Sequence, residues 1–159
     1  AATVGADPTQ MIDTAIMVLP EDCWTRRALE RAKRVATTVE ADEEGLATIS
    51  DELVVEFWPW ADLATEAIPL AFAALLATRG DFAKAVPFGV RFGRDADTIG
   101  AIAGSMAGAL GGEAAIPASW RARVQMSTGA CIGFIANRQI TEIADQLTAK
   151  AWETYGDTF

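Results

Sequence analysis

One apolar segment of the chain carries glycine at every fourth position, at Gly100, Gly104 and Gly108. Residues four apart lie on the same face of an α-helix, so these glycines form a stripe that lets another backbone approach closely. The segment is shorter than the roughly 20 residues that a helix needs to cross a bilayer. The stripe therefore predicts a helix that packs tightly inside a protein core. Its larger apolar residues also recur at helical spacing: Ile99, Ile102, Ala103, Met106 and Leu110.

The same helical period recurs along the rest of the sequence, without the alternation typical of strands. Asp7 and Pro8 indicate the start of a helix that ends before Pro20, and Asp81 is expected to cap another. Residues 40–45 and 48–60 lack a clear period, so we interpret them as loops. Further helices are expected after Asp22, from Thr65 to Gly80, after Pro117 and from Thr141. The pattern predicts an all-α fold, a compact bundle of helices.

The last of these helices has its own apolar pattern. Its apolar residues are expected to point inward: Ile143, Ala144, Leu147, Ala151 and Trp152. A length of 159 residues is also within the range of a single domain.

The charge balance of the chain limits its partners. A net charge of −9 argues against binding to a nucleic-acid backbone, which relies on clustered Lys and Arg. The basic cluster at 26–34 is interpreted as a solvated helix face. Cys23 and Cys131 are too few for a disulfide framework. With no signal peptide or bilayer-length apolar run visible, we expect a soluble, cytoplasmic protein that does not contact membranes.

The chain contains no histidine. This excludes Ser-His-Asp and Cys-His catalysis, imidazole-zinc sites and acid-base chemistry by histidine. Any chemistry must come from carboxylates, hydroxyls, Lys, Tyr or bound ions.

Carboxylates interrupt the apolar pattern in one organised place, Asp95-Ala96-Asp97-Thr98. Hard oxygen ligands of this kind select Mg²⁺, Mn²⁺ or Ca²⁺ over zinc or copper. Two interpretations stay open on spacing alone, because Asp97 or Thr98 can also cap the glycine-striped helix. An EF-hand is excluded because Ile99 and Leu110 stand near its later ligand positions. A phosphatase-type Asp-x-Asp motif is disfavoured because the surroundings are helical rather than α/β.

Phe57-Trp58-Pro59-Trp60 forms a compact aromatic turn. These rings could offer an aromatic wall for a base, but a core or interface role is the favoured interpretation.

The stretch from Gly93 to Gly104, with Gly108-Ala109-Leu110-Gly111-Gly112 and Ile116-Pro117-Ala118-Ser119-Trp120, resembles the terminal motif of the ADP-ribosylglycohydrolase family. Glu66-Ala67-Ile68-Pro69-Leu70-Ala71, Gly80-Asp81-Phe82 and the opening residues 1–29 are also similar to that family. The resemblance is weakest over residues 40–60 and after Arg121.

The resemblance implies an all-α, metal-dependent hydrolase that cleaves the glycosidic bond between ADP-ribose and an acceptor, either a protein side chain or a small molecule. It implies that Asp95, Asp97 and Thr98 are ligands of a pair of Mg²⁺ or Mn²⁺ ions, with Asp95 and Asp97 catalytic. Gly93 and Arg94 are expected to contact the substrate.

One departure from the family bears on activity. The family's other ligands lie in a Gly-Asp segment followed by a glutamate and in a Thr-Asp-Asp element, and this sequence has neither. We therefore expect residues 1–159 to be the C-terminal part of a single ADP-ribosylglycohydrolase-like domain, active with a complementary N-terminal segment or chain. The alternatives are a non-catalytic binding or structural relative, and a hydrolase of another N-glycoside.

Overall fold

The computed structural model describes residues 5–56, 59–130 and 132–156. The chain divides into two compact units, Ala1–Ile116 and Pro117–Phe159. The described residues form α-helices and short 3₁₀ turns, and their one β pairing is an isolated bridge between Met126 and Gln139. The predicted all-α fold is confirmed, whereas a single domain over residues 1–159 stays a prediction.

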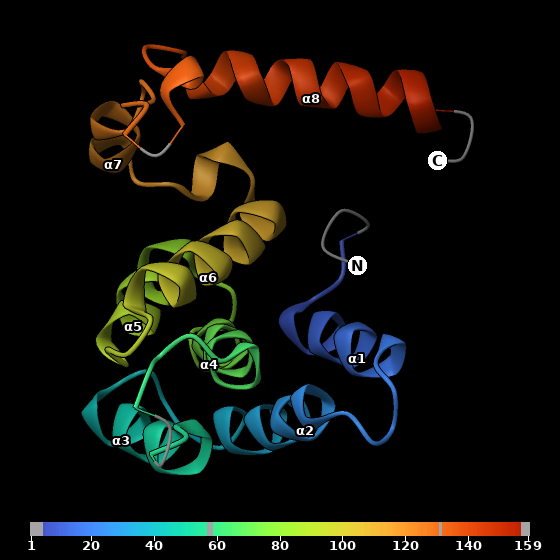
Figure 1. Ribbon diagram of the computed structural model, residues 1–159, viewed down its shortest axis with the longest axis vertical. Helices are drawn as coiled ribbons and strands as arrows, with labels where there is room; N and C mark the ends of the chain where they lie inside the picture. Colours follow the sequence, from blue (N-terminus) through green and yellow to red (C-terminus); the bar gives the residue numbers. More distant parts are fainter. Residues whose placement is uncertain (1–4, 57–58, 131, 157–159) are drawn as a thin grey trace. The chain divides into compact units, whose positions relative to one another are not determined.

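The first unit is built around one central helix (Figure 1). Helix α4 packs against each of the other five α-helices of the unit. In chain order the elements are α1 (Pro8–Val18), α2 (Trp24–Ala36), α3 (Glu43–Leu53), α4 (Ala64–Ala77), α5 (Phe82–Arg91), α6 (Ala96–Gly111) and the 3₁₀ turn η2 (Glu113–Ala115).

The sequence of α4 explains its central position. Apolar residues stand on all its sides, and a helix that is hydrophobic all round is stable only when it is buried. Residues 66, 67 and 69–77 are buried, and Leu70 and Leu75 have no exposed surface. Complete burial of one such leucine contributes about 2 kcal/mol to the free energy of unfolding. Helix α4 is therefore the core of the first unit.

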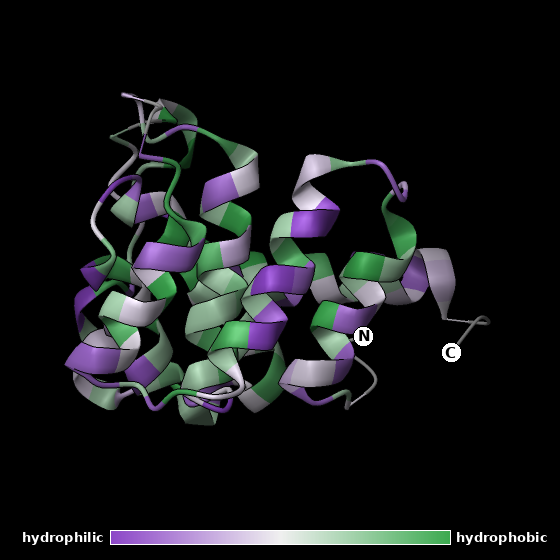
Figure 2. Ribbon diagram, turned by 90° about the horizontal axis from the view of Figure 1, so that it is seen from below, coloured by the Kyte–Doolittle hydropathy of each residue, from purple (hydrophilic) through white to green (hydrophobic). Residues whose placement is uncertain are grey.

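Hydrophobic and hydrophilic residues alternate along many of the helices (Figure 2), and α2 shows the pattern of an amphipathic helix. Helix α2 buries four side chains at helical spacing, Leu29, Ala32, Val35 and Ala36. The basic cluster occupies the remaining sides of the helix, where Arg27, Arg31 and Arg34 are exposed. The prediction of a solvated basic face is confirmed.

Aspartate residues fix the starts of three helices. In each case a carboxylate oxygen accepts a hydrogen bond from the backbone N–H three residues later, which satisfies a group left unpaired at a helix end. These pairs are Asp7 with Gln10 at 2.8 Å, Asp42 with Gly45 at 2.9 Å and Asp81 with Lys84 at 3.2 Å. The predicted caps at Asp7 and Asp81 are confirmed.

The prediction of a loop over residues 48–60 is wrong for its first part, because Glu43–Leu53 forms α3. Glu43 and Glu44 lie in the first turn of this helix, where negative charge favours the positive end of the helix dipole. Ile49 and Leu53 lie four residues apart and are buried. Glu43 and Glu44 thus belong to the start of a helix rather than to a loop.

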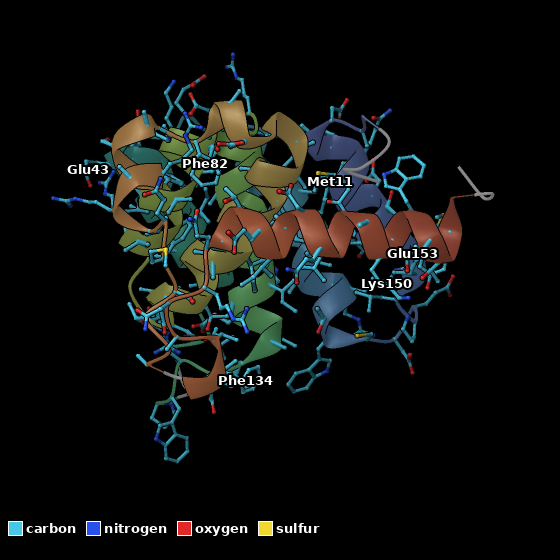
Figure 3. All side chains as sticks on the ribbon, turned by 90° about the horizontal axis from the view of Figure 1, so that it is seen from above. Met11, Glu43, Phe82, Phe134, Lys150 and Glu153 are labelled. Carbon is cyan, nitrogen blue, oxygen red and sulfur yellow. The ribbon has the colours of Figure 1, made fainter. Side chains whose placement is uncertain are left out.

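The glycine stripe of α6 faces α5. A Cβ atom placed on Gly100 would lie 2.8 Å from Cγ2 of Val90, and one on Gly104 would lie 3.1 Å from Cγ2 of Val86. Further along, Gly108 lies against the ring of Phe82, which is labelled in Figure 3. The predicted tight packing of this stripe against another helix is confirmed.

The second unit contains α7 (Ala118–Arg123), the 3₁₀ turn η3 (Gly133–Ile135) and α8 (Ile140–Tyr155). Helix α8 has no buried residue, and Leu147 and Trp152 are 66% and 62% exposed. The prediction that its apolar residues point inward is therefore wrong for the second unit taken by itself. Lys150 and Glu153 lie on the same side of α8 (Figure 3), with Nζ of Lys150 2.9 Å from Oε2 of Glu153.

None of the helices in the described part of the chain combines the length and the apolar character that crossing a bilayer requires.

Candidate functional site

The candidate ligands follow a sharp turn between α5 and α6. Phe92 anchors the end of α5, where its buried ring meets Phe88 edge-on with the ring centroids 5.4 Å apart. The next two residues both have left-handed backbone conformations, with φ of 68° at Gly93 and 56° at Arg94. The chain thereby reverses direction and enters α6 at Asp95.

Asp95 occupies the N-cap position of α6. Its carbonyl oxygen accepts the backbone N–H of Ile99 at 2.9 Å, whereas its side chain makes no capping hydrogen bond. Asp97 and Thr98 lie inside the first turn, because the helix begins at Ala96. Of the two interpretations left open by the spacing, the one in which Asp97 or Thr98 caps the helix is therefore wrong.

The oxygens of these three side chains are not committed to the fold. Asp95 is half-buried, and Asp97 and Thr98 are exposed. In the described ranges, none of the three side chains takes part in a hydrogen bond or an ion pair. The positive end of the α6 dipole favours negative charge at this point. The oxygens of three side chains are thus available as metal ligands at the N-terminal end of α6.

These donors suit a hard cation but make up only part of a ligand set. Carboxylate and hydroxyl oxygens are ligands that Mg²⁺ and Mn²⁺ accept. No group of three or more Asp, Glu, His or Cys side chains that could hold a metal ion is found among the described residues. Further ligands must come from water or from other residues.

A buried carboxylate on α4 binds the arginine of this turn. Glu66 is 1% exposed, and its Oε1 accepts a hydrogen bond of 2.7 Å from Nε of Arg94. Its Oε2 accepts one of 3.1 Å from Nη2 of the same guanidinium and one of 2.7 Å from the backbone N–H of Val55. A buried charge requires such partners, because leaving it unpaired is costly.

The ion pair also affects the ionisation of the arginine. The hydrogen bond to Glu66 raises the pKa of the Arg94 guanidinium, which outweighs the opposite effect of desolvation. Arg94 therefore stays charged.

The importance of Glu66 has one signal in the sequence, which the pattern of motifs does not include. Glu66 is the single charged residue of α4, whose other residues are apolar apart from Thr65 in the first turn. A charge in a helix that must be buried on all sides requires a buried partner. The identity of that partner is not visible locally, because Arg94 lies 28 residues away.

The predicted substrate contacts of Gly93 and Arg94 stay predictions. A Cβ atom placed on Gly93 would meet nothing within 4 Å, so there is open space beside this residue. The side chain of Arg94 points toward α4, where it binds Glu66.

The aromatic turn lies partly outside the described residues, which omit Phe57 and Trp58. Trp60 is 64% exposed and is not a core residue. Its carbonyl oxygen accepts a hydrogen bond of 3.5 Å from Nη2 of Arg94. The segment around Trp60 therefore joins the same network as the turn before α6.

The sequence matches the model of a known protein family. The sequence model of the ADP-ribosylglycohydrolase family matches residues 1–156, a range that takes in the turn with Asp95, Asp97 and Thr98. Searches of curated proteins and of solved structures found no match.

Proposed function

The chain belongs to the ADP-ribosylglycohydrolase family, and from this we propose that it takes part in hydrolysing the glycosidic bond between ADP-ribose and an acceptor. Asp95, Asp97 and Thr98 would hold Mg²⁺ or Mn²⁺, with two ions in a complete site. The acceptor would be part of an ADP-ribosylated protein or a small molecule.

The observation that carries this proposal is the uncommitted state of the three side chains. An aspartate at a helix start usually caps it, as Asp7, Asp42 and Asp81 do here. Asp95 stands at the cap position without making that bond. Carboxylates that do not serve the helix remain available for a ligand.

Hydrolysis joins a water oxygen to the anomeric carbon, while the bond from that carbon to the acceptor breaks and a proton passes to the acceptor atom. When bound, the ions supply Lewis acidity, which lowers the pKa of coordinated water and orients ribose hydroxyls. A carboxylate oxygen of Asp95 or Asp97 would accept the proton that the water loses and pass it on to the acceptor atom, since this chain has no histidine for that role.

The ligand set that this sequence supplies is partial, so the proposal includes ligands from residues outside it. A complementary segment or chain would provide them, as the motifs missing from this sequence suggest. Carboxylates from two parts of the site would then surround the ions.

A second candidate is a non-catalytic relative that keeps the fold. This candidate is favoured by the incomplete ligand set: among the described residues, no group of three or more side chains that could hold a metal ion comes together. A different N-glycoside as substrate is the third, since a shared fold does not fix the substrate.

The test measures the release of ADP-ribose from a panel of acceptors linked through arginine, through serine or to a small molecule, with Mn²⁺ and the complementary segment or chain present. Asp97→Asn should abolish release, because the amide removes one negative ligand. Asp51→Asn, which makes the same change on the exposed side of α3, should leave release unchanged. Activity that Asp97→Asn does not diminish would overturn the proposed site.

Native mass spectrometry of the purified protein with Mn²⁺ and ADP-ribose separates the candidates. A complex that holds two ions and one ADP-ribose supports the hydrolase. A chain that binds no ion at millimolar Mn²⁺ supports the non-catalytic relative.

A further inference from the structure

We propose that Glu66 is a positioning residue for the candidate metal ligands, acting through Arg94. Its carboxylate fixes the guanidinium of Arg94 and thereby the turn that presents Asp95 and Asp97. The consequence for metal binding rests on the proposed function. The effect on the turn itself does not.

The first observation is how completely the carboxylate is engaged. Both of its oxygens accept hydrogen bonds from Arg94, and one of them also accepts the N–H of Val55. A two-point contact between a carboxylate and a guanidinium fixes orientation as well as distance. Because Glu66 lies on the central helix and is 1% exposed, the anchor itself has little freedom to move.

The second observation is the backbone of Arg94. Its φ of 56° lies in the left-handed region, which residues other than glycine adopt infrequently. Arg94 directly precedes Asp95, so any change in its backbone angles changes the direction in which Asp95 enters α6. The ion pair holds the arginine in a conformation that its own preferences disfavour.

The third observation is what the pair connects. Through Val55 and Trp60 the same network reaches the segment between α3 and α4, and through Arg94 it reaches the start of α6. Glu66 thus ties one end of the candidate site to the core of the unit.

The variant Glu66→Gln tests this inference, because it keeps the size of the side chain and removes its charge. Two amide protons report on the turn: that of Gly93, bonded to the carbonyl of Val90 at 3.1 Å, and that of Ile99, bonded to the carbonyl of Asp95 at 2.9 Å. Their hydrogen exchange should become about tenfold faster, as expected for loss of a charge-assisted contact. The amide of Gly112, at the other end of α6, should exchange at its original rate.

Glu43→Gln is the matched control. Glu43 (labelled in Figure 3) pairs with Arg91 at the surface, and the variant makes the same chemical change near α5 without touching the turn. It should leave the exchange of Gly93 and Ile99 unchanged. Unchanged exchange in Glu66→Gln, or an equal rise in Glu43→Gln, would overturn the inference.

The second readout is the affinity for Mn²⁺, followed by electron paramagnetic resonance. Glu66→Gln should weaken binding by about tenfold or more, the usual effect of losing a group that orients a metal ligand. In a chain that already carries Arg94→Gly, the same substitution should have no further effect. Losses that simply add in the double variant would show that Glu66 does not act through Arg94.

Failure of the proposed function and failure of the Glu66→Gln variant to fold can each be distinguished from failure of this inference. If the wild-type protein binds no Mn²⁺ even with its complementary segment or chain, the proposed function fails, and the exchange rates still decide the role of Glu66. If Glu66→Gln does not fold, Arg94→Lys replaces it, because lysine keeps the charge but lacks the two-point contact. It should speed exchange at Ile99 in the same way, and unchanged exchange there would overturn the inference.

Discussion

Val90 on α5 lies directly beside Gly100 on α6, so closely that a Cβ atom on the glycine would approach its Cγ2 to 2.8 Å. The spacing widens along the stripe, to 3.1 Å between Gly104 and Val86 and to 3.7 Å between Gly108 and the ring of Phe82. The room for a side chain between α5 and α6 therefore increases from Gly100 to Gly108.

Alanine substitutions along the stripe should differ in sign. Gly108→Ala should stabilise the protein by up to about 1 kcal/mol, because alanine favours the helix and the contact is an ordinary one. Gly100→Ala should destabilise it by about 1 kcal/mol, because Val90 must move. Urea unfolding measures both, and adding Val90→Ala should recover most of the loss. Equal effects at the two glycines would contradict the geometry.

Gly45 in α3 should resist substitution for a different reason. A Cβ atom there would lie 1.9 Å from the backbone oxygen of Glu40, which cannot move aside as a flexible side chain can. Gly45→Ala should cost about 3 kcal/mol of stability, although alanine is the better helix former. Ala47→Gly, on the exposed side of the same helix, should cost about 1 kcal/mol. A stabilising Gly45→Ala would refute the close approach.

Cys23 should react as a partly activated thiol. The backbone N–H of Arg26, at the N-terminal end of α2, is the main cause that lowers the pKa of this thiol. Since the thiolate is the reactive form, the alkylation rate in a Cys131→Ser background should reach half its maximum at a lower pH than for an ordinary cysteine.

A pair of variants tests this cause. Arg26→Pro removes the N–H and should move the midpoint of the alkylation profile upward, whereas Arg26→Ala keeps the N–H and should not. Identical profiles for the two variants would assign the shift elsewhere.

Local signals in the sequence predicted most of the first unit. Asp7 and Asp81 act on backbone groups three residues away, and the glycine stripe shows its own period of four, so both can be recognised from spacing alone. Helix α3 was missed because its acidic start was taken for a loop, although charge at that place favours a helix.

The missed parts of the candidate site are non-local. Glu66 and Arg94 meet only after α4 and α6 have packed, and no spacing rule connects residues 28 apart. The apolar pattern of α8 likewise showed that one face is apolar, but a pattern on one helix does not identify what covers it. Contacts of this kind depend on tertiary structure.

Helix α4 is buried by helices that precede it in the sequence and by helices that follow it, and this order has a consequence for biosynthesis. Helix α4 emerges from the ribosome after α2 but before α6, and both pack against it. Until residues 96–111 have been made, one side of the most apolar helix of the unit has no cover. Exposed apolar surface on an incomplete chain promotes aggregation. The nascent protein is therefore most dependent on chaperones during the interval between the synthesis of α4 and that of α6.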